Sequence, residues 1–273
     1  EVSESRTPGS FERAPRLPKG ATDAQKADHD AKMADYMKRR AGFEASAKAD
    51  WAAWSPDFAA HDVVVLSYNG ETWPRAVEEK LEAYVSGGGK LVNVHASNNP
   101  FPDWEAFNQM IGLGWRGAEF GFRVTVNKDG TINRIPPGED GGAGHGAKHP
   151  YVVTIHGSDH PITKGLPKVW MHGTDELYHS QRGPAENMTV FASAFDSEEI
   201  GGTGKHEPMV WAIPFGEGTV VTNVMGHLRA DQEEKDAVHC VGFQTVFART
   251  VEWAATGDVT LPVPAQFPGE DEA

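Results

Sequence analysis

The feature that most constrains the fold is a pair of short apolar runs separated by one amphipathic segment. Val63–Tyr68 and Leu91–His95 are rich in β-branched residues, as strands buried on both faces of a parallel sheet are. Between them, apolar residues recur at helical spacing from Pro74 until Gly87–Gly89 stops the pattern. This order predicts a βαβ unit with a right-handed crossover, and therefore a parallel sheet.

Similar patterns predict the elements on either side of this unit. Thr22–Asp50 holds mostly helix-forming residues with few large apolar groups, which indicates an exposed helix. The other expected elements are helices over Trp104–Ile111 and Val241–Ala255, strands over Tyr151–His156 and Met188–Phe195, and hairpins over Arg123–Arg134 and Pro208–Met225. Together they predict an α/β fold with an open, mostly parallel sheet flanked by helices, and with an added β-hairpin. We expect residues 1–60 to form an extended and helical N-terminal segment, 61–264 the main domain and 265–273 a tail.

Composition narrows the possible partners. The chain has 39 acidic against 25 basic residues and a net charge of −14, and it contains no run rich in Lys and Arg. Nucleic acid and anionic membranes are therefore poor partners. No stretch reaches the roughly 20 apolar residues of a membrane span, so we expect a soluble protein. Cys240 is the only cysteine, which excludes an intrachain disulfide and a cysteine-based zinc site.

Polar side chains follow the predicted strands where each strand ends. Asn69 follows the first strand, His95 and Asn98 follow the second, and His227 follows the last hairpin. In open α/β sheets, ligands bind outside the carboxyl ends of the strands. His95 and His227 are therefore expected to face one crevice.

Other polar clusters compete for the same crevice. They are Asp175 with Glu176, His206 with Glu207, Trp104, and the pair His145 and His149 in a glycine-rich loop. Imidazole with carboxylate is the ligand set of zinc and related ions, and it also serves as general base and general acid. The spacing of His145 and His149 suits one helical face, but the surrounding glycines argue against a helix.

Each candidate also has a purely structural interpretation. A histidine at a strand end, such as His95, can simply bond a loop carbonyl. Asp175 and Glu176 can cap a helix or form salt bridges. Cys240 is better explained as a small packing residue than as a nucleophile.

Six segments together resemble the trehalose-utilisation (ThuA-like) family. They are VVVLSYNGETWP, GGGKLVNVHASNN, HPITKGLPKVWMHGTDELY, GGTGKHEPMVWAI, GEGTVVTNVMGH and a closing VEWAATG. The resemblance runs from about His61 to Pro264. That family is similar in fold to class I glutamine amidotransferases, which implies a flavodoxin-like sheet and agrees with the βαβ unit.

The resemblance also implies a missing nucleophile. In these amidotransferases, the strand matching Leu91–Val94 ends in a tight elbow that carries a catalytic cysteine, and a later strand presents a catalytic histidine. Here the elbow region carries His95 and Ser97, and His227 falls where the later histidine would be. Cysteine-dependent glutamine hydrolysis is thus disfavoured. Ser97 lacks the G-x-S-x-G pattern that would support it as a substitute.

What the family implies is bacterial sugar metabolism, in the cytoplasm or the periplasm. Its members are associated with trehalose and related disaccharides, including 3-keto derivatives, and with a divalent metal such as zinc. The resemblance implies an enzyme, possible homo-oligomer formation and a small carbohydrate as ligand; the alternative is a non-catalytic sugar-binding module. The implied catalytic residues are His95, Glu176 and His227, the implied substrate contacts are Asn69, Asn98, Trp104, Asp175 and Glu207, and the implied metal ligands are His95, His206 and His227.

One part of the family pattern has no counterpart. Members begin with a βα unit whose strand ends in a Gly-x-x-His-Asp-Trp-like segment, and nothing here matches it. We therefore expect that unit to be missing or that another segment completes the sheet.

Overall fold

The computed structural model describes residues 2–12, 14–228 and 235–271. The chain divides into two compact units. The first comprises Glu1–Asp57 with Gly70–Glu79, and the second comprises Phe58–Asn69 with Lys80–Ala273. The predicted catalytic residues all belong to the second unit.

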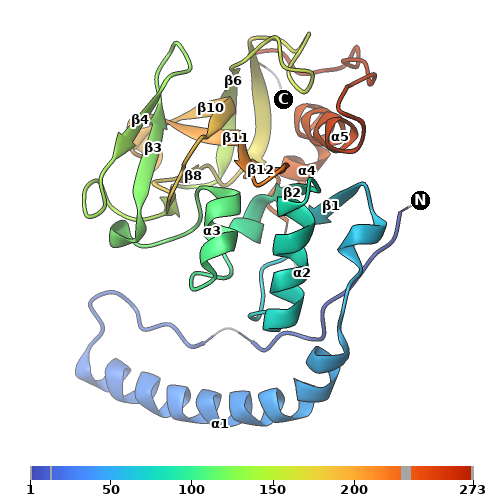
Figure 1. Ribbon diagram of the computed structural model, residues 1–273. Helices are drawn as coiled ribbons and strands as arrows, with labels where there is room; N and C mark the ends of the chain where they lie inside the picture. Colours follow the sequence, from blue (N-terminus) through green and yellow to red (C-terminus); the bar gives the residue numbers. More distant parts are fainter. Residues whose placement is uncertain (1, 13, 229–234, 272–273) are drawn as a thin grey trace. The chain divides into compact units, whose positions relative to one another are not determined.

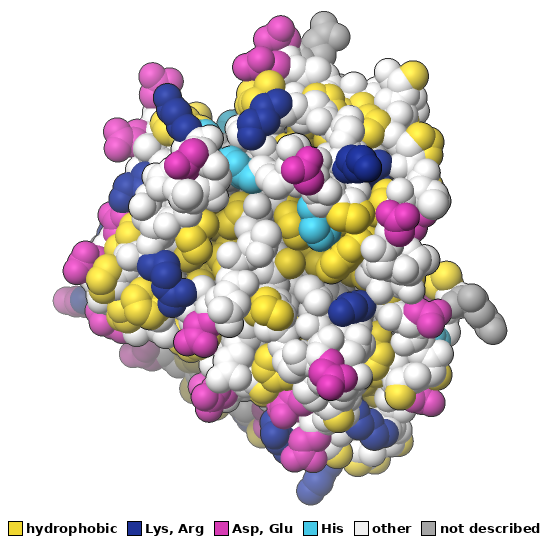
Figure 2. Space-filling view, turned by 45° about the horizontal axis from the view of Figure 1, so that its top comes forward, with side chains coloured by type: hydrophobic (Ala, Val, Ile, Leu, Met, Phe, Trp, Pro, Cys, Tyr) yellow, Lys and Arg dark blue, Asp and Glu magenta, His cyan; other side chains and the backbone are white. Residues whose placement is uncertain are grey.

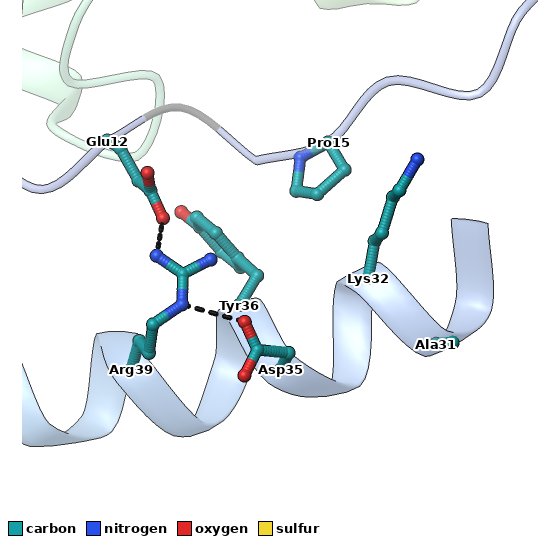
Figure 3. A pocket seen from close by; sticks show the side chains of 7 residues that line it. All are labelled: Glu12, Pro15, Ala31, Lys32, Asp35, Tyr36 and Arg39. Atoms are coloured by element: carbon teal, nitrogen blue, oxygen red, sulfur yellow. Dashed lines mark hydrogen bonds and ion pairs between the residues drawn. The ribbon is translucent and has the colours of Figure 1, made fainter. Parts of the chain in front are cut away.

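The first unit is built around one long helix, α1 (Asp23–Ala53). It begins with a capping box, in which Thr22 Oγ1 accepts from the Gln25 amide and the Gln25 side chain accepts from the Thr22 amide. Only Tyr36 and Ala47 are buried among its residues, which confirms the exposed helix expected from the composition. Figure 3 shows a pocket of this unit, where Arg39 bonds Asp35 on α1 and Glu12 in the preceding segment.

The second unit contains a seven-stranded sheet in the order β1-β2-β12-β11-β10-β6-β7 (Figure 1). The strands are β1 (Val63–Leu66), β2 (Lys90–Val94), β6 (His149–Ile155), β7 (Val169–Asp175), β10 (Thr189–Asp196), β11 (Lys205–Phe215) and β12 (Gly218–Asn223). β1, β2 and β12 are parallel, and every other pairing in this sheet is antiparallel. The sheet is mixed, so the expected mostly parallel sheet was wrong. The β11–β12 hairpin reverses the chain over Gly216 and Glu217, and strands joined this closely must run antiparallel.

Two smaller sheets complete the strands. One comprises β3 (Phe122–Val126), β4 (Ile132–Ile135) and β9 (Arg182–Gly183), and the other pairs β5 (Gly144–His145) with β8 (Tyr178–His179). The β3–β4 pair is the predicted hairpin, and its turn is closed by a bond from the Asn127 amide to the Thr131 carbonyl at 2.8 Å. The β5–β8 pair attaches the glycine-rich loop next to the segment that follows β7.

Helices lie on both faces of the large sheet (Figure 1). They are α2 (Arg75–Ser86), α3 (Glu105–Ile111), α4 (Asp236–His239) and α5 (Val241–Thr256), with 3-10 turns η1 (Phe58–Ala60), η2 (His95–Asn98), η3 (Ala118–Phe120) and η4 (Glu198–Ile200). α3 packs against β11 and β12, and α5 packs against β1, β2 and β7. Close packing of α5 requires Gly242, because a Cβ there would lie 2.3 Å from the Trp170 ring. Within the described residues, no helix is long and apolar enough to cross a membrane.

Candidate functional site

His95 stands at the elbow between β2 and η2. Its backbone has φ of 42°, the left-handed region that non-glycine residues rarely adopt, and such strain costs on the order of 1–3 kcal/mol. The side chain is buried, and its Nδ1 lies 2.8 Å from the Val224 carbonyl oxygen. Because a carbonyl only accepts, Nδ1 carries the proton and Nε2 keeps its lone pair. Burial lowers the pKa of the His95 imidazole, which favours this neutral form.

Glu176 and His227 meet His95 from two other parts of the chain. Glu176 follows β7, and its Oε2 lies 3.9 Å from His95 Nε2. His227 follows β12, and its Nε2 lies 3.3 Å from Glu176 Oε1. One nitrogen or oxygen atom from each of the three side chains lies within 4.8 Å of the others. The structure thus brings together the three residues that the resemblance implied as catalytic, and we refer to them as the His–Glu–His cluster.

Asp175 holds two members of this cluster in place. Its buried carboxylate accepts from the backbone amides of Glu176 at 2.7 Å, Gly226 at 2.7 Å and His227 at 3.1 Å. It also pairs with His172 Nε2 at 2.9 Å. Asp175 was expected to contact substrate, but internal donors occupy its carboxylate. It is instead a positioning residue.

The His172–Asp175 pair is buried and charged. Burial alone would lower the pKa of His172, but its interactions with the Asp175 carboxylate and with the Cys240 side chain outweigh burial and raise the pKa to about 9. Burial likewise tends to raise the pKa of Asp175, and His172 reverses this and lowers it. The pair is therefore an imidazolium and a carboxylate at neutral pH.

Glycine is required at position 226, immediately before His227. Its φ is 95°, and a Cβ there would lie 2.5 Å from the Phe243 ring. The tight turn lets two consecutive amides point at one carboxylate.

The glycine-rich loop contributes His145 and Lys148 to the site. Spacing in the sequence did not separate His145 from His149 and did not point to Lys148. The β5–β8 pairing places His145 Nε2 3.8 Å from Glu176 Oε1. Lys148 Nζ lies 3.5 Å from the same oxygen and 2.9 Å from His227 Nδ1. His149 instead contacts the Tyr151 ring and the Ala147 carbonyl, so His145 and His149 do not act as a pair.

Trp104 does not lie at the cluster. It is buried against Phe101 and Phe107, and its indole donates to Glu82, so its ring offers no face to a sugar. Trp115 is the half-buried tryptophan near the site: its ring centroid lies 4.7 Å from that of Tyr178, which in turn lies 4.7 Å from that of His95. Figure 2 shows histidine side chains reaching the surface among hydrophobic ones.

Asn69 and Asn98 were both expected to touch substrate, and their surroundings differ. Asn98 is buried, and its amide donates to Gln181 Oε1 at 2.5 Å and to the Leu113 carbonyl at 3.3 Å. Asn69 is exposed beyond the end of β1. Neither takes part in the contacts that the structure describes around Glu176.

His206 and Glu207 are neighbours on β11 and point to opposite faces, as successive strand residues do. Glu207 is buried, where it pairs with Arg123 and accepts from Thr203 Oγ1 at 2.7 Å and the Ser180 amide at 3.1 Å. His206 is half-buried beside the Phe195 ring. The structure therefore does not bring His206 to His95 and His227, and internal donors occupy Glu207.

No cysteine stands at the elbow. Ser97 Oγ donates to the Leu66 carbonyl at 3.0 Å and accepts from the Tyr68 amide at 2.7 Å, so its hydroxyl is occupied in joining η2 to β1. Cys240, the single cysteine, is buried beside His172 at the start of α5.

The His–Glu–His cluster fits a divalent cation of the zinc class. Two imidazole nitrogens and a carboxylate oxygen are ligands that zinc takes. His95 meets a further requirement, since its Nδ1 bonds a backbone carbonyl as metal-bound histidines usually do. Its Nε2 is buried and has no hydrogen-bond partner among the described residues.

Comparison with known proteins identifies the family. A family model described as ThuA, trehalose utilisation, matches residues 19–254. The chain belongs to the ThuA family. A crystal structure of a putative ThuA-like protein from Parabacteroides merdae is 37% identical, with a TM-score of 0.76, and the match covers 82% of this chain and 80% of that one.

More distant solved structures are also similar. A putative ThuA-like protein from Bacteroides uniformis is 17% identical with a TM-score of 0.48, and the match covers 93% of this chain and 97% of that one. A β-galactosidase from Bacillus circulans is 16% identical with a TM-score of 0.36, over 69% of this chain and 22% of the other. No curated protein matches the chain.

Proposed function

We propose that this ThuA-family protein is an enzyme that acts on a carbohydrate, either a disaccharide or a 3-keto-glycoside, through the His–Glu–His cluster. The observation that carries the proposal is the convergence of His95, Glu176 and His227 within 4.8 Å from three separate elements. Family membership, which links the chain to trehalose utilisation, supports the choice of a sugar.

The residues suit proton transfer next to a carbonyl group. His95 is neutral and buried with a free Nε2 lone pair, which is the form that accepts a proton. Glu176 lies between the two histidines and can pass a proton to either side. Isomerisation, elimination and hydrolysis of a keto-sugar would all use these groups. A divalent metal held by His95, Glu176 and His227 would polarise a carbonyl or hydroxyl of the substrate.

The test combines elemental analysis with turnover of 3-keto-trehalose and other 3-keto-glycosides. Glu176→Gln and His227→Ala should each lower kcat/KM by at least about 100-fold, the usual range for loss of an acid–base group. His206→Ala is the matched control, because it removes a histidine outside the cluster, and it should keep full activity. Equal rates in wild type, Glu176→Gln and His227→Ala would overturn the proposal. Tight sugar binding without turnover would favour the non-catalytic binding module.

Trp115 is expected to hold the sugar ring. Its half-buried indole lies beside Tyr178, which contacts His95, and the apolar face of a pyranose packs on such a ring. Trp115→Ala should raise KM by about tenfold, which corresponds to about 1.4 kcal/mol, and should change kcat less. Steady-state kinetics would measure this, with Phe195→Ala as an exposed aromatic control away from the cluster. An unchanged KM in Trp115→Ala would show that the ring does not contact substrate.

A further inference from the structure

Lys148 is a loop residue that contacts two members of the His–Glu–His cluster. Its Nζ lies 2.9 Å from His227 Nδ1 and 3.5 Å from Glu176 Oε1. The loop that carries it is held on both sides, by the β5–β8 pairing and by a bond of 3.0 Å from the Ala147 amide to the Ile200 carbonyl. Lys148 is thus held at His227 by backbone contacts.

This contact determines where the proton of a neutral His227 lies. An ammonium group has three donors and no acceptor, so Lys148 donates and His227 Nδ1 accepts. The ring proton must then be on Nε2, which faces Glu176 Oε1 at 3.3 Å. Lys148 therefore donates to His227, and the Nε2–H of His227 lies on the side of Glu176.

In the other two imidazoles near Glu176, the ring proton is on Nδ1 and not on Nε2. His95 Nδ1 donates to the Val224 carbonyl, and its Nε2 lone pair faces Glu176 Oε2. His145 Nδ1 lies 2.7 Å from the Gly146 carbonyl, which leaves its Nε2 lone pair facing Glu176 as well. Of the three imidazoles that the structure describes within 3.9 Å of Glu176, His227 is the one whose Nε2 presents a proton.

We propose that Lys148 is a positioning residue that makes His227 the hydrogen-bond donor of the site, opposite His95 as the proton acceptor. This inference rests on the proposed function. In the reaction, His95 Nε2 takes a proton from a carbon next to the substrate carbonyl, and the electrons of that C–H bond move toward the carbonyl oxygen. The Nε2–H of His227 donates a hydrogen bond to that oxygen, and Lys148 keeps its hydrogen bond to Nδ1. A cation that binds His227 through Nε2 must first displace the Lys148 hydrogen bond, because a protonated nitrogen has no lone pair to offer.

The direct test is the tautomer of His227, read from long-range ¹H–¹⁵N NMR of the full chain as purified. Wild type should show a protonated Nε2 and an unprotonated Nδ1. Lys148→Met should lose this preference, and Lys148→Arg, which keeps a donor, should retain it. Lys164→Met is the matched control, since Lys164 is an exposed lysine on a distant turn. An unprotonated Nε2 in wild type, or the same tautomer in Lys148→Met, would overturn the proposal.

Kinetics provide a second measurement. Lys148→Met should lower kcat by about tenfold, with a smaller change in KM. This is less than the roughly 100-fold that loss of an acid–base group costs, because His227 itself remains. Lys148→Arg should restore most of kcat. A rise in KM without loss of kcat would contradict a role for His227 as hydrogen-bond donor to the reacting oxygen. The two proposals can fail separately: if wild type has the expected tautomer but no 3-keto-glycoside is turned over, the proposed function is wrong and the role of Lys148 in orienting His227 stands.

Discussion

Asp175→Ala is expected to lower the free energy of unfolding by about 3–5 kcal/mol, the cost of leaving one partner of a buried ion pair alone. The substitution leaves His172 without its acidic partner, and the His172 side chain is fully buried. It also removes the acceptor for the backbone amides of Glu176, Gly226 and His227. Activity should fall together with stability, because both His227 and Glu176 lose the group that positions them.

Urea denaturation of wild type, Asp175→Ala and Asp175→Asn would measure this loss. Asp175→Asn keeps the size and one acceptor oxygen, so we expect it to be less destabilised than Asp175→Ala. Asp159→Ala removes an exposed carboxylate and should change stability by less than about 0.5 kcal/mol. If Asp175→Ala is as stable as Asp159→Ala, the carboxylate does not hold the site together.

The same pair predicts how stability depends on pH. The pKa of His172 is about 9 in the folded protein and 6.5 as a model value, so the folded state binds its proton more tightly. The stabilisation is therefore fully present below pH 6.5 and is lost as the pH rises toward 9, by about 3 kcal/mol in total. Wild type should lose more stability than His172→Gln between pH 6 and 10. Parallel pH curves for the two proteins would contradict the assignment.

Glu207→Ala is the second substitution expected to have a large effect, again about 3–5 kcal/mol. Glu207 and Arg123 form an ion pair whose side chains are each 1% exposed. Loss of the carboxylate leaves the guanidinium with only Asp140 as an acidic partner among the described residues, and it removes the acceptor of the Ser180 amide. The destabilisation comes from an uncompensated buried charge.

A double substitution separates the pair from its surroundings. Arg123→Met with Glu207→Met should recover much of the lost stability, since neither charge is then left unpaired. Glu186→Ala, on an exposed carboxylate, is the control. If Glu207→Ala is as stable as Glu186→Ala and instead raises KM for sugar, then Glu207 faces substrate and the buried-pair assignment is wrong.

Local patterns were enough to predict most of the elements. The weakly apolar stretch of helix-forming residues became α1, and the two β-branched runs became β1 and β2. The mixed sheet was not predicted, because local patterns indicated β6, β10 and the β11–β12 hairpin but not which of these strands pair with one another. Strand direction depends on which strands pair, and that is a property of the whole fold.

The meeting of His95 and His227 could be anticipated for a simple reason. Each follows one of two adjacent parallel strands, β2 and β12, and parallel strands end at one edge of the sheet. The sequence could not separate Trp104 from Trp115, or Glu207 from Glu176. The choice depends on which side of an element faces the cluster, and that is decided by packing against residues far away in the chain.

The sequence by itself therefore determined the βαβ unit, the loss of the elbow cysteine and the two histidines at strand ends, because these depend on local periodicity and on residue identity. Only the tertiary structure decided the rest of the site. The two-residue β5–β8 pairing is too short to leave a pattern, yet it brings His145 and Lys148 to Glu176. The proton of His95 is likewise placed by the carbonyl of Val224, 129 residues away, because a hydrogen-bond partner acts through distance in space rather than along the chain.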